Sequence, residues 1–161
     1  LAQAQREGTP ITAVFIDLDK FKEVNDGQGH ATGDAVLVCV AEGLSARLRA
    51  SDIAGRLGGD EFALLLPGME GESAKAYVED LRRRLLNTMS GRRWPVTFSI
   101  GVASYARAPA DLDGLLAEAD SLMFEVKHGG RNRVLQRDLT PHVRTTLSRQ
   151  FAGTAGVTRK Q

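Results

Sequence analysis

The segment 52–66 constrains the fold of this chain more than any other. Two short apolar runs flank Gly58 and Gly59, a pattern typical of two strands joined by a two-residue turn. The glycines carry no side chains, so the phosphates of a ligand can approach the backbone closely. Asp60 and Glu61 follow, and we expect them to point to opposite faces of the sheet because side chains alternate along a strand. One carboxylate is then available to a metal ion and the other to a different partner.

The rest of the chain alternates between strand-like and helix-like patterns. Apolar runs predict strands at 11–18, 96–103 and 133–135, and apolar residues at helical spacing predict helices at 32–49, 72–90 and 111–127. This order predicts an α+β fold with a central, mostly antiparallel sheet flanked by helices, of the ferredoxin-like or polymerase-palm kind. Residues 1–135 are expected to form one domain. Residues 136–161 are expected to form a helix starting at Thr140-Pro141 and a partly disordered linker.

Composition excludes several classes of protein. The chain has 161 residues, enough for one core, and 21 basic against 20 acidic residues. This balance gives no reason to expect nucleic acid as a partner. A single cysteine excludes an internal disulfide, and no apolar run approaches the ~20 residues that span a bilayer, so we expect no membrane contact by this fragment. Because the first residue is leucine, we expect the chain to be an excised fragment.

Asp17 closes the apolar strand 11–18, and Asp19 follows two residues later. A carboxylate at position 17 is unfavourable unless it is exposed or paired with a cation. The local pattern alone favours a strand end that turns into solvent, and the alternative is a metal ligand.

Asn25 and Asp34 form a second polar group. An amide and a carboxylate together match the edge of guanine, which presents two N–H donors and also acceptors. Taken alone, Asn25 is also typical of a turn and Asp34 of a charge in the first turn of a helix.

Lys127 and Arg131 flank the segment 128–130, so the end of a helix and a glycine turn place two cations together. Without further context they are solvated charges that favour a helix C-terminus.

Several segments together resemble the GGDEF family, the diguanylate cyclases. The similarity covers about 11–134 and rests on Phe15–Asp26, Gly29-His30, Gly33-Asp34, Ala54–Leu66, Thr97–Ala103 and Gly130–Val134. Many independent motifs in one order make chance similarity very improbable. The family also has a turn and an Asn-Arg segment before the first of these motifs. They are absent here, so we expect that the N-terminal part of the family domain is missing.

The resemblance implies the following roles. It places Mg²⁺, or Mn²⁺, on the Asp17 carboxylate, the backbone carbonyl of Leu18 and Asp60. It assigns guanine recognition to Asn25 and Asp34, the terminal phosphates to Lys127 and Arg131, and the triphosphate backbone contacts to Phe21 and Lys22. Gly58, Gly59, Asp60 and Glu61 form the catalytic signature, in which Glu61 either assists the nucleophile or maintains the structure.

The resemblance also implies an activity, the condensation of two GTP into cyclic di-GMP and two pyrophosphates, for which a homodimer is needed. It assigns product inhibition by cyclic di-GMP to Arg49 and Asp52, with Arg82 or Arg83 as a third residue. From the residues alone, Arg49 and Asp52 are as well explained by a surface ion pair worth under about 1 kcal/mol.

A different class of function stays open. The domain is alternatively a non-catalytic module that senses GTP or cyclic di-GMP within a larger signalling protein. The presence of both Asp17 and Asp60 favours the enzyme. In either case we expect further sensory or effector domains in the parent protein, and a location in the bacterial cytoplasm or on the cytoplasmic side of a membrane-anchored parent.

Overall fold

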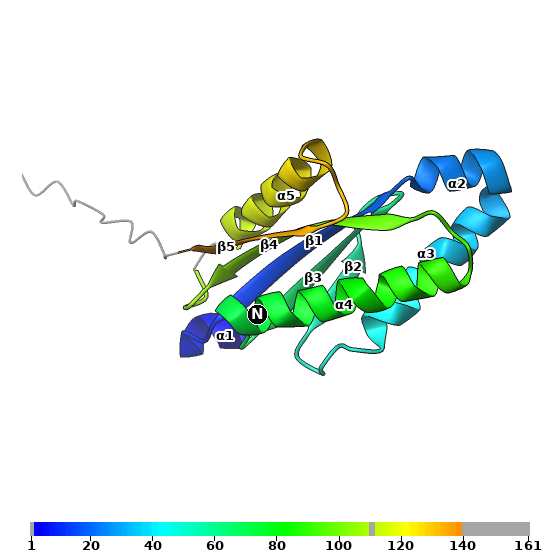
Figure 1. Cartoon of the computed structure of the whole chain (residues 1–161). Helices are drawn as coiled ribbons and strands as arrows, with labels where there is room; N and C mark the ends of the chain where they lie inside the picture. The colour runs from blue at the N-terminus through cyan, green and yellow to red at the C-terminus, as the bar shows by residue number, and fades with distance from the viewer. Residues whose placement is uncertain (1, 110–111, 140–161) are drawn as a thin grey trace, which may run out of the picture.

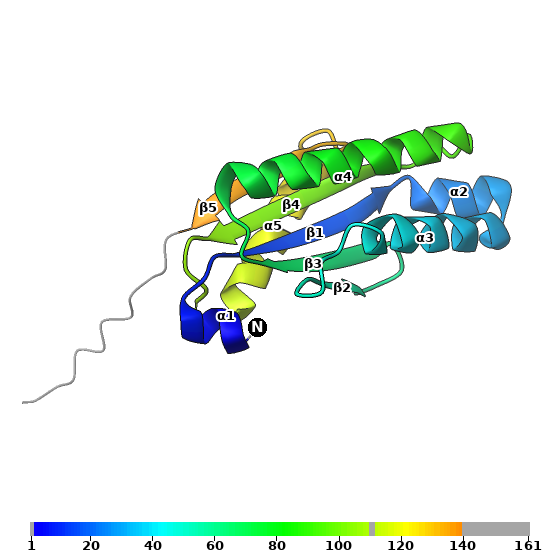
Figure 2. The ribbon, with the colours of Figure 1, turned by 90° about the horizontal axis from the view of Figure 1, so that it is seen from below.

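The computed structural model describes residues 2–109 and 112–139, and these form one five-stranded sheet with helices on both faces (Figure 1). The strands are β1 (Ile11–Asp19), β2 (Ile53–Arg56), β3 (Glu61–Pro67), β4 (Thr97–Tyr105) and β5 (Val134–Leu139). Their order across the sheet is β2-β3-β1-β4-β5 (Figure 2). All neighbours are antiparallel except β4 and β5. The predicted α+β fold is therefore confirmed.

The helices divide between the two faces of the sheet. They are α1 (Ala2–Glu7), α2 (Phe21–Gln28), α3 (His30–Ser45), α4 (Gly71–Gly91) and α5 (Asp113–His128). In Figure 1, α5 lies above the sheet, α3 and α4 lie below it, and α2 continues beyond the end of β1. No helix among the described residues has the length and apolar character needed to cross a membrane.

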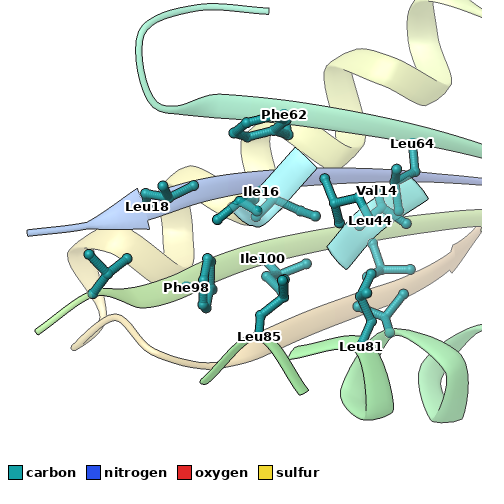
Figure 3. Packing of buried hydrophobic residues seen from close by; sticks show 14 of the residues in the cluster. Val14, Ile16, Leu18, Leu44, Phe62, Leu64, Leu81, Leu85, Phe98 and Ile100 are labelled. Carbon is teal, nitrogen blue, oxygen red and sulfur yellow. The ribbon is translucent and has the colours of Figure 1, made fainter. Parts of the chain in front are cut away.

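The central strand β1 is buried on both faces, and this decides where its polar residues point. Val14, Ile16 and Leu18 pack against α3 and α4 (Figure 3). Ile11 and Ala13 belong to the second core, under α5. Because side chains alternate along a strand, the odd-numbered residues that follow, including Asp17 and Asp19, lie on the α5 face. The C-terminal end of α5 is thus the natural source of cations for these carboxylates.

The structure corrects the predicted boundaries of three elements. The segment 25–27, which reads as a turn, lies inside α2. The helix predicted at 32–49 ends at Ser45, so Arg49 stands in the following loop. The last strand runs to Leu139 instead of ending at residue 135. The helix predicted from Thr140 lies outside the described residues.

The signature hairpin also differs in detail from the prediction. The loop spans four residues, 57–60, and is closed by a bond from the Leu57 N–H to the Glu61 carbonyl oxygen (2.9 Å). Neither glycine has the positive φ that a two-residue turn requires. The Arg56 guanidinium instead donates to the carbonyl oxygens of Gly58 (2.9 Å) and Gly59 (2.8 Å), which stabilises the wider loop.

Candidate active site

A cleft of about 350 Å³ opens where β1 ends and α2 begins. Asp17, Leu18, Phe21, Lys22, Asp60, Lys127 and Arg131, all named from the sequence, line it together with Asp19, Lys20, Glu23 and Asp26. Three chain segments far apart in sequence therefore meet here, namely the end of β1 with the start of α2, the signature loop, and the end of α5. The sequence analysis assigned no role to the last four residues.

Asp17 is a buried carboxylate of the cleft and is paired with Lys127. Its side chain is 3% exposed, and Oδ2 accepts a hydrogen bond from the Lys127 ammonium at 2.8 Å. Burial raises the pKa of Asp17, the Lys127 bond opposes this, and the charges of Asp60 and Asp19 add to the rise. The bond to Asp17 in turn raises the pKa of Lys127. The strand end does not turn into solvent, so the interpretation that the local pattern favoured for Asp17 is wrong.

Asp60 is fixed to the same strand through the backbone. The Leu18 N–H donates to the Asp60 carbonyl oxygen at 3.1 Å, and Glu61 pairs with Asp17 across β1 and β3. The charges of both Asp60 and Glu61 raise the pKa of Lys127. Asp60 lines the cleft and Glu61 does not, although the charges of both reach Lys127. That the two side chains point to opposite faces of the sheet stays a prediction.

The donor set in the cleft fits a hard divalent cation. Asp17 and Asp60 offer carboxylate oxygens and Leu18 a carbonyl oxygen, the ligand types that Mg²⁺ prefers. No group of three His, Cys, Asp or Glu side chains is arranged around a common metal position in the described part of the chain. A cation held here would need oxygens from phosphate or water to complete its coordination, which is usual for Mg²⁺ in nucleotide sites.

Asp19 is a functional candidate that the sequence analysis missed. Its side chain is fully buried, accepts from the hydroxyls of Thr97 (2.8 Å) and Ser99 (2.7 Å), and accepts from the Asn132 N–H (3.2 Å). The Arg131 guanidinium lies 3.9 Å away. The signal was present in the sequence, because a residue two positions after Asp17 in a strand shares its face.

Asn25 and Asp34 lie outside the lining of the cleft, on two helices that pack side by side. At Gly33 a Cβ atom would lie 1.9 Å from Asn25 Oδ1, so α2 approaches α3 at a position with no side chain. Asp34 follows Gly33 and is exposed. The structure thus brings Asn25 next to the helix turn that carries Asp34, and Asn25 lies about one turn beyond the start of α2 in the cleft.

The loop with Arg49 and Asp52 has a different character. The Asp52 carboxylate accepts from the Arg49 backbone N–H (2.8 Å), and the Asp52 N–H donates to the Arg49 carbonyl oxygen (3.0 Å). Asp52 therefore shapes the loop through the backbone. Among the described residues, no ion pair involves the Arg49 guanidinium, so the surface ion pair considered from the sequence is not formed.

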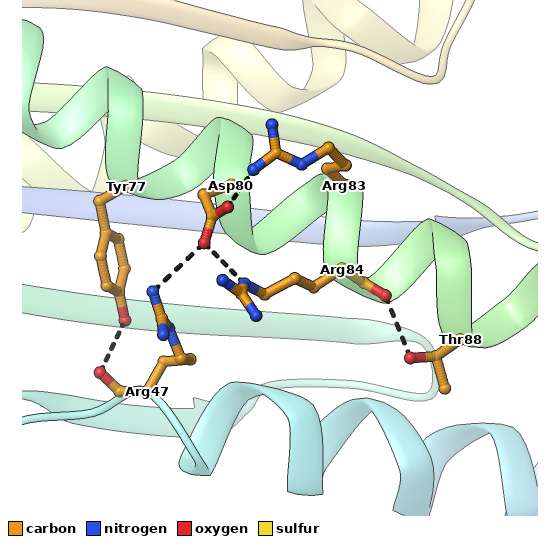
Figure 4. A network of polar contacts seen from close by, with 6 residues as sticks. All are labelled: Arg47, Tyr77, Asp80, Arg83, Arg84 and Thr88. Carbon is orange, nitrogen blue, oxygen red and sulfur yellow. Dashed lines mark hydrogen bonds and ion pairs between the residues drawn. The ribbon is translucent and has the colours of Figure 1, made fainter.

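The two arginines considered as a third residue of this site have different partners. Arg82 donates to Asn132, near the cleft. Arg83 contacts Asp80, which also accepts from Arg84 (2.7 Å) and from Arg47 (3.2 Å), two residues before Arg49 (Figure 4). Arg84 and Arg83 lower the pKa of Asp80, and the hydrogen bond from Arg84 contributes most. Tyr77 completes the network through its hydroxyl, which donates to the Arg47 carbonyl oxygen at 3.2 Å.

Comparison with known proteins settles the family. The model of a family described as "Diguanylate cyclase, GGDEF domain" matches residues 1–133. The chain belongs to the GGDEF domain family. This GGDEF domain is 38% identical over 138 residues to the diguanylate cyclase DosC of Escherichia coli. The matched region covers 83% of this chain and 30% of DosC. The chain therefore spans about a third of the length of that relative.

Solved structures of other GGDEF domains are similar to this one. The GGDEF domain of DgcB from Caulobacter crescentus, in complex with c-di-GMP, has a TM-score of 0.72 at 30% identity, over 84% of this chain and 82% of that one. The active GGEEF domain of a diguanylate cyclase from Vibrio cholerae has a TM-score of 0.74 at 28% identity, over 84% and 87%.

Proposed function

We propose that this GGDEF domain is a diguanylate cyclase, which condenses two GTP into cyclic di-GMP and two pyrophosphates. The observation that carries this proposal is the buried Asp17–Lys127 pair at 2.8 Å, in one cleft with Asp60 and Arg131. Two carboxylates for a metal ion and two cations for phosphates are the groups that nucleotidyl transfer needs. The curated relatives, which carry the name diguanylate cyclase, support the assignment.

Asp17, the Leu18 carbonyl and Asp60 hold Mg²⁺ or Mn²⁺ in this proposal. When bound, the cation withdraws charge from the α-phosphate and stabilises the departing pyrophosphate. Asp17 would hold the cation in place of the Lys127 ammonium, and Lys127 would then be available to bind the terminal phosphates together with Arg131, whose side chain is 57% exposed.

The start of α2 contributes backbone donors. The first N–H groups of a helix have no partner within it, and Phe21 and Lys22, the first residues of α2, line the cleft. We assign them to the triphosphate. Farther along α2 and α3, Asn25 and Asp34 read the guanine edge, with Asp34 accepting from the two N–H donors of the base.

One such cleft binds one GTP, so the proposal requires a homodimer in which two domains face each other. Each 3′-hydroxyl attacks the α-phosphate of the opposite nucleotide and displaces pyrophosphate. The hydroxyl proton leaves during the attack, and in this proposal Glu61 either assists this step or maintains the loop. Gly59 lets the phosphates approach the backbone of the signature loop, since a Cβ there would enter open space, whereas a Cβ at Gly58 would lie 3.1 Å from a Glu61 carboxylate oxygen.

We further propose that cyclic di-GMP inhibits the enzyme at Arg49 and Asp52, with Arg83 as the contributing helix residue. The free Arg49 guanidinium can form a bidentate fork with phosphate or with the guanine edge. Arg83 is chosen over Arg82 because Arg82 is only 18% exposed and donates to Asn132, whereas Arg83, which contacts Asp80, is 70% exposed. The c-di-GMP complex of the DgcB domain supports binding of this product by the fold.

The parent protein is proposed to carry further sensory or effector domains on the cytoplasmic side of a bacterial cell. The short share of DosC that this chain covers supports additional domains.

The test is incubation with GTP and Mg²⁺ over a range of protein concentrations, with the products separated by chromatography. The proposal predicts cyclic di-GMP from GTP, no cyclic dinucleotide from ATP, and a specific activity that rises with protein concentration because the dimer is the active form. Binding of GTP without any product would instead favour the non-catalytic sensing module.

A further inference from the structure

The turn that carries Arg131 has a backbone that needs outside support. Gly130, Arg131 and Asn132 have φ values of 113°, 62° and 50°, so three successive residues adopt the left-handed region. Residues other than glycine rarely adopt this backbone conformation. It persists only where contacts with the surrounding structure hold it in place. The described structure shows contacts of that kind on two sides of the turn.

Asp19 supports the turn from inside the domain. Its buried carboxylate accepts from the Asn132 N–H at 3.2 Å and lies 3.9 Å from Arg131 Nε. Bonds from Thr97 and Ser99 on β4 fix the orientation of this carboxylate. Asp19 therefore ties the turn to the strand that also carries Asp17.

Arg82 supports the turn from α4. Its guanidinium donates to the carbonyl oxygen of Asn132 and to Asn132 Oδ1 (3.0 Å), and its side chain is only 18% exposed. The Arg82 Nε is buried without a hydrogen-bond partner, so this side chain is held in place at some energetic expense. Its neighbours Arg83 and Arg84 are 70% and 57% exposed and bind Asp80 on their own helix.

We infer that Asp19 and Arg82 are positioning residues for the terminal phosphates of GTP, because together they hold the turn that presents Arg131 to the cleft. The inference rests on the proposed function, which assigns Arg131 to those phosphates. Neither residue contacts the nucleotide in this account. Loss of either lets the turn relax toward ordinary backbone conformations, and Arg131 then no longer points reliably into the cleft.

The experiment compares two ligands by calorimetry with Mg²⁺ present. One is 3′-deoxy-GTP, which lacks the attacking hydroxyl and does not react, and the other is GMP, which lacks the terminal phosphates. We expect Arg82→Gln and Asp19→Asn to weaken binding of 3′-deoxy-GTP about tenfold, or ~1.4 kcal/mol, and to change binding of GMP less than about twofold. Arg82→Lys keeps the positive charge and a hydrogen-bond donor but lacks the planar guanidinium, so its effect should be intermediate.

Arg84→Gln is the matched control, since it removes the same charge from the same helix without touching the turn. It should bind both ligands like the parent. Equal weakening of both ligands by Arg82→Gln would overturn the inference, because it would show general loss of structure. Asp19 is buried and its variant is the one more prone to misfold, and in that case Arg82→Gln decides alone.

Arg131→Ala separates this inference from the proposed function. If Arg131→Ala loses affinity for 3′-deoxy-GTP but Arg82→Gln and Asp19→Asn do not, the positioning role is wrong and the phosphate role of Arg131 stands. If Arg131→Ala itself binds 3′-deoxy-GTP like the parent, the proposed phosphate site is wrong, and the inference falls with it.

Discussion

The cleft and the Arg49–Asp52 loop both contain acidic and basic residues, but the charged side chains differ in burial and in their partners. In the cleft, Asp17 and Asp19 are almost fully buried and each has donors fixed around it. In the loop, Asp52 bonds to backbone N–H, and no ion pair of the described residues involves the Arg49 guanidinium. Buried, oriented charges are suited to chemistry because they need no reorganisation. An exposed, unpaired guanidinium is suited to a ligand that arrives and leaves. The comparison predicts that mutations in the cleft affect turnover and that mutations in the loop affect regulation.

The largest effect is expected from Asp60→Asn, which removes one charged metal ligand from the cleft. Cyclic di-GMP synthesis should fall at least a thousandfold, about 4 kcal/mol of transition-state stabilisation, while the fold is retained. Asp120→Asn removes the same charge from an exposed position on α5 that does not line the cleft, and it should retain activity within about threefold. Activity of Asp60→Asn within about tenfold of the parent, at equal folded concentration, would exclude the metal role.

A smaller effect on base recognition is expected from Asp34→Ala. The guanine N–H donors lose their acceptor, so the dissociation constant of GTP should rise about tenfold or more and the preference over ATP should decrease. Calorimetric titration with both nucleotides measures this. An unchanged ratio of GTP to ATP affinity would show that the base is read elsewhere.

Gly33→Ala sharpens the same prediction without removing a polar group. The new Cβ would lie 1.9 Å from Asn25 Oδ1, so the Asn25 side chain must move. Selectivity for GTP over ATP should decrease severalfold. Gly27→Ala is the control on α2, because a Cβ there meets nothing within 4 Å. Wild-type selectivity in Gly33→Ala would separate Asn25 from guanine recognition.

In the loop, Arg49→Ala should change the response to product and spare turnover. Progress curves of the parent should flatten as cyclic di-GMP accumulates, and those of the variant should stay linear for longer, with initial rates within about twofold. Lys75→Ala removes an exposed charge from α4, and its curves should follow the parent. If added cyclic di-GMP slows parent and Arg49→Ala equally, the loop has no inhibitory role.

The smallest effect concerns stability and pH. Burial raises the pKa of Asp17 above its ordinary value of 3.8, so the folded state binds this proton more tightly than the unfolded state. The contribution of Asp17 to stability is therefore present at low pH and is lost as pH rises through the raised pKa. The Asp17→Asn variant has no carboxyl to titrate at this position, so it does not lose stability in this way. Lys127, whose side chain is 32% exposed, can turn to solvent in the variant. Relative to the parent, the variant should gain stability in denaturant unfolding as the pH rises above 3.8. A stability difference that does not change with pH would contradict the pKa direction.

Periodic elements were predictable from the sequence, and contacts between distant segments were not. The strand 11–18 and the helix 111–127 have clear apolar patterns, so the place of Asp17 and Lys127 on them was predictable. Helix α2 was missed because it buries only Val24 and contains a turn-like Asn-Asp-Gly. In the structure α3 packs closely against it at Gly33, a contact between helices that no local pattern indicates.

The roles of the arginines on α4 show the same limit more clearly. Arg82, Arg83 and Arg84 are three consecutive arginines, and the local sequence does not distinguish their roles. Their positions around the helix direct Arg82 to the Asn132 turn and the other two to Asp80. Only the fold, which brings residue 132 beside residue 82, distinguishes them.

The most direct test of the account is the initial rate of cyclic di-GMP formation from GTP and Mg²⁺ by the parent, Asp60→Asn and Arg49→Ala at equal folded concentration. The account predicts product from the parent, a similar initial rate from Arg49→Ala, and no detectable product from Asp60→Asn. Equal rates for the parent and Asp60→Asn, or a parent that binds GTP and forms no cyclic dinucleotide, would contradict it.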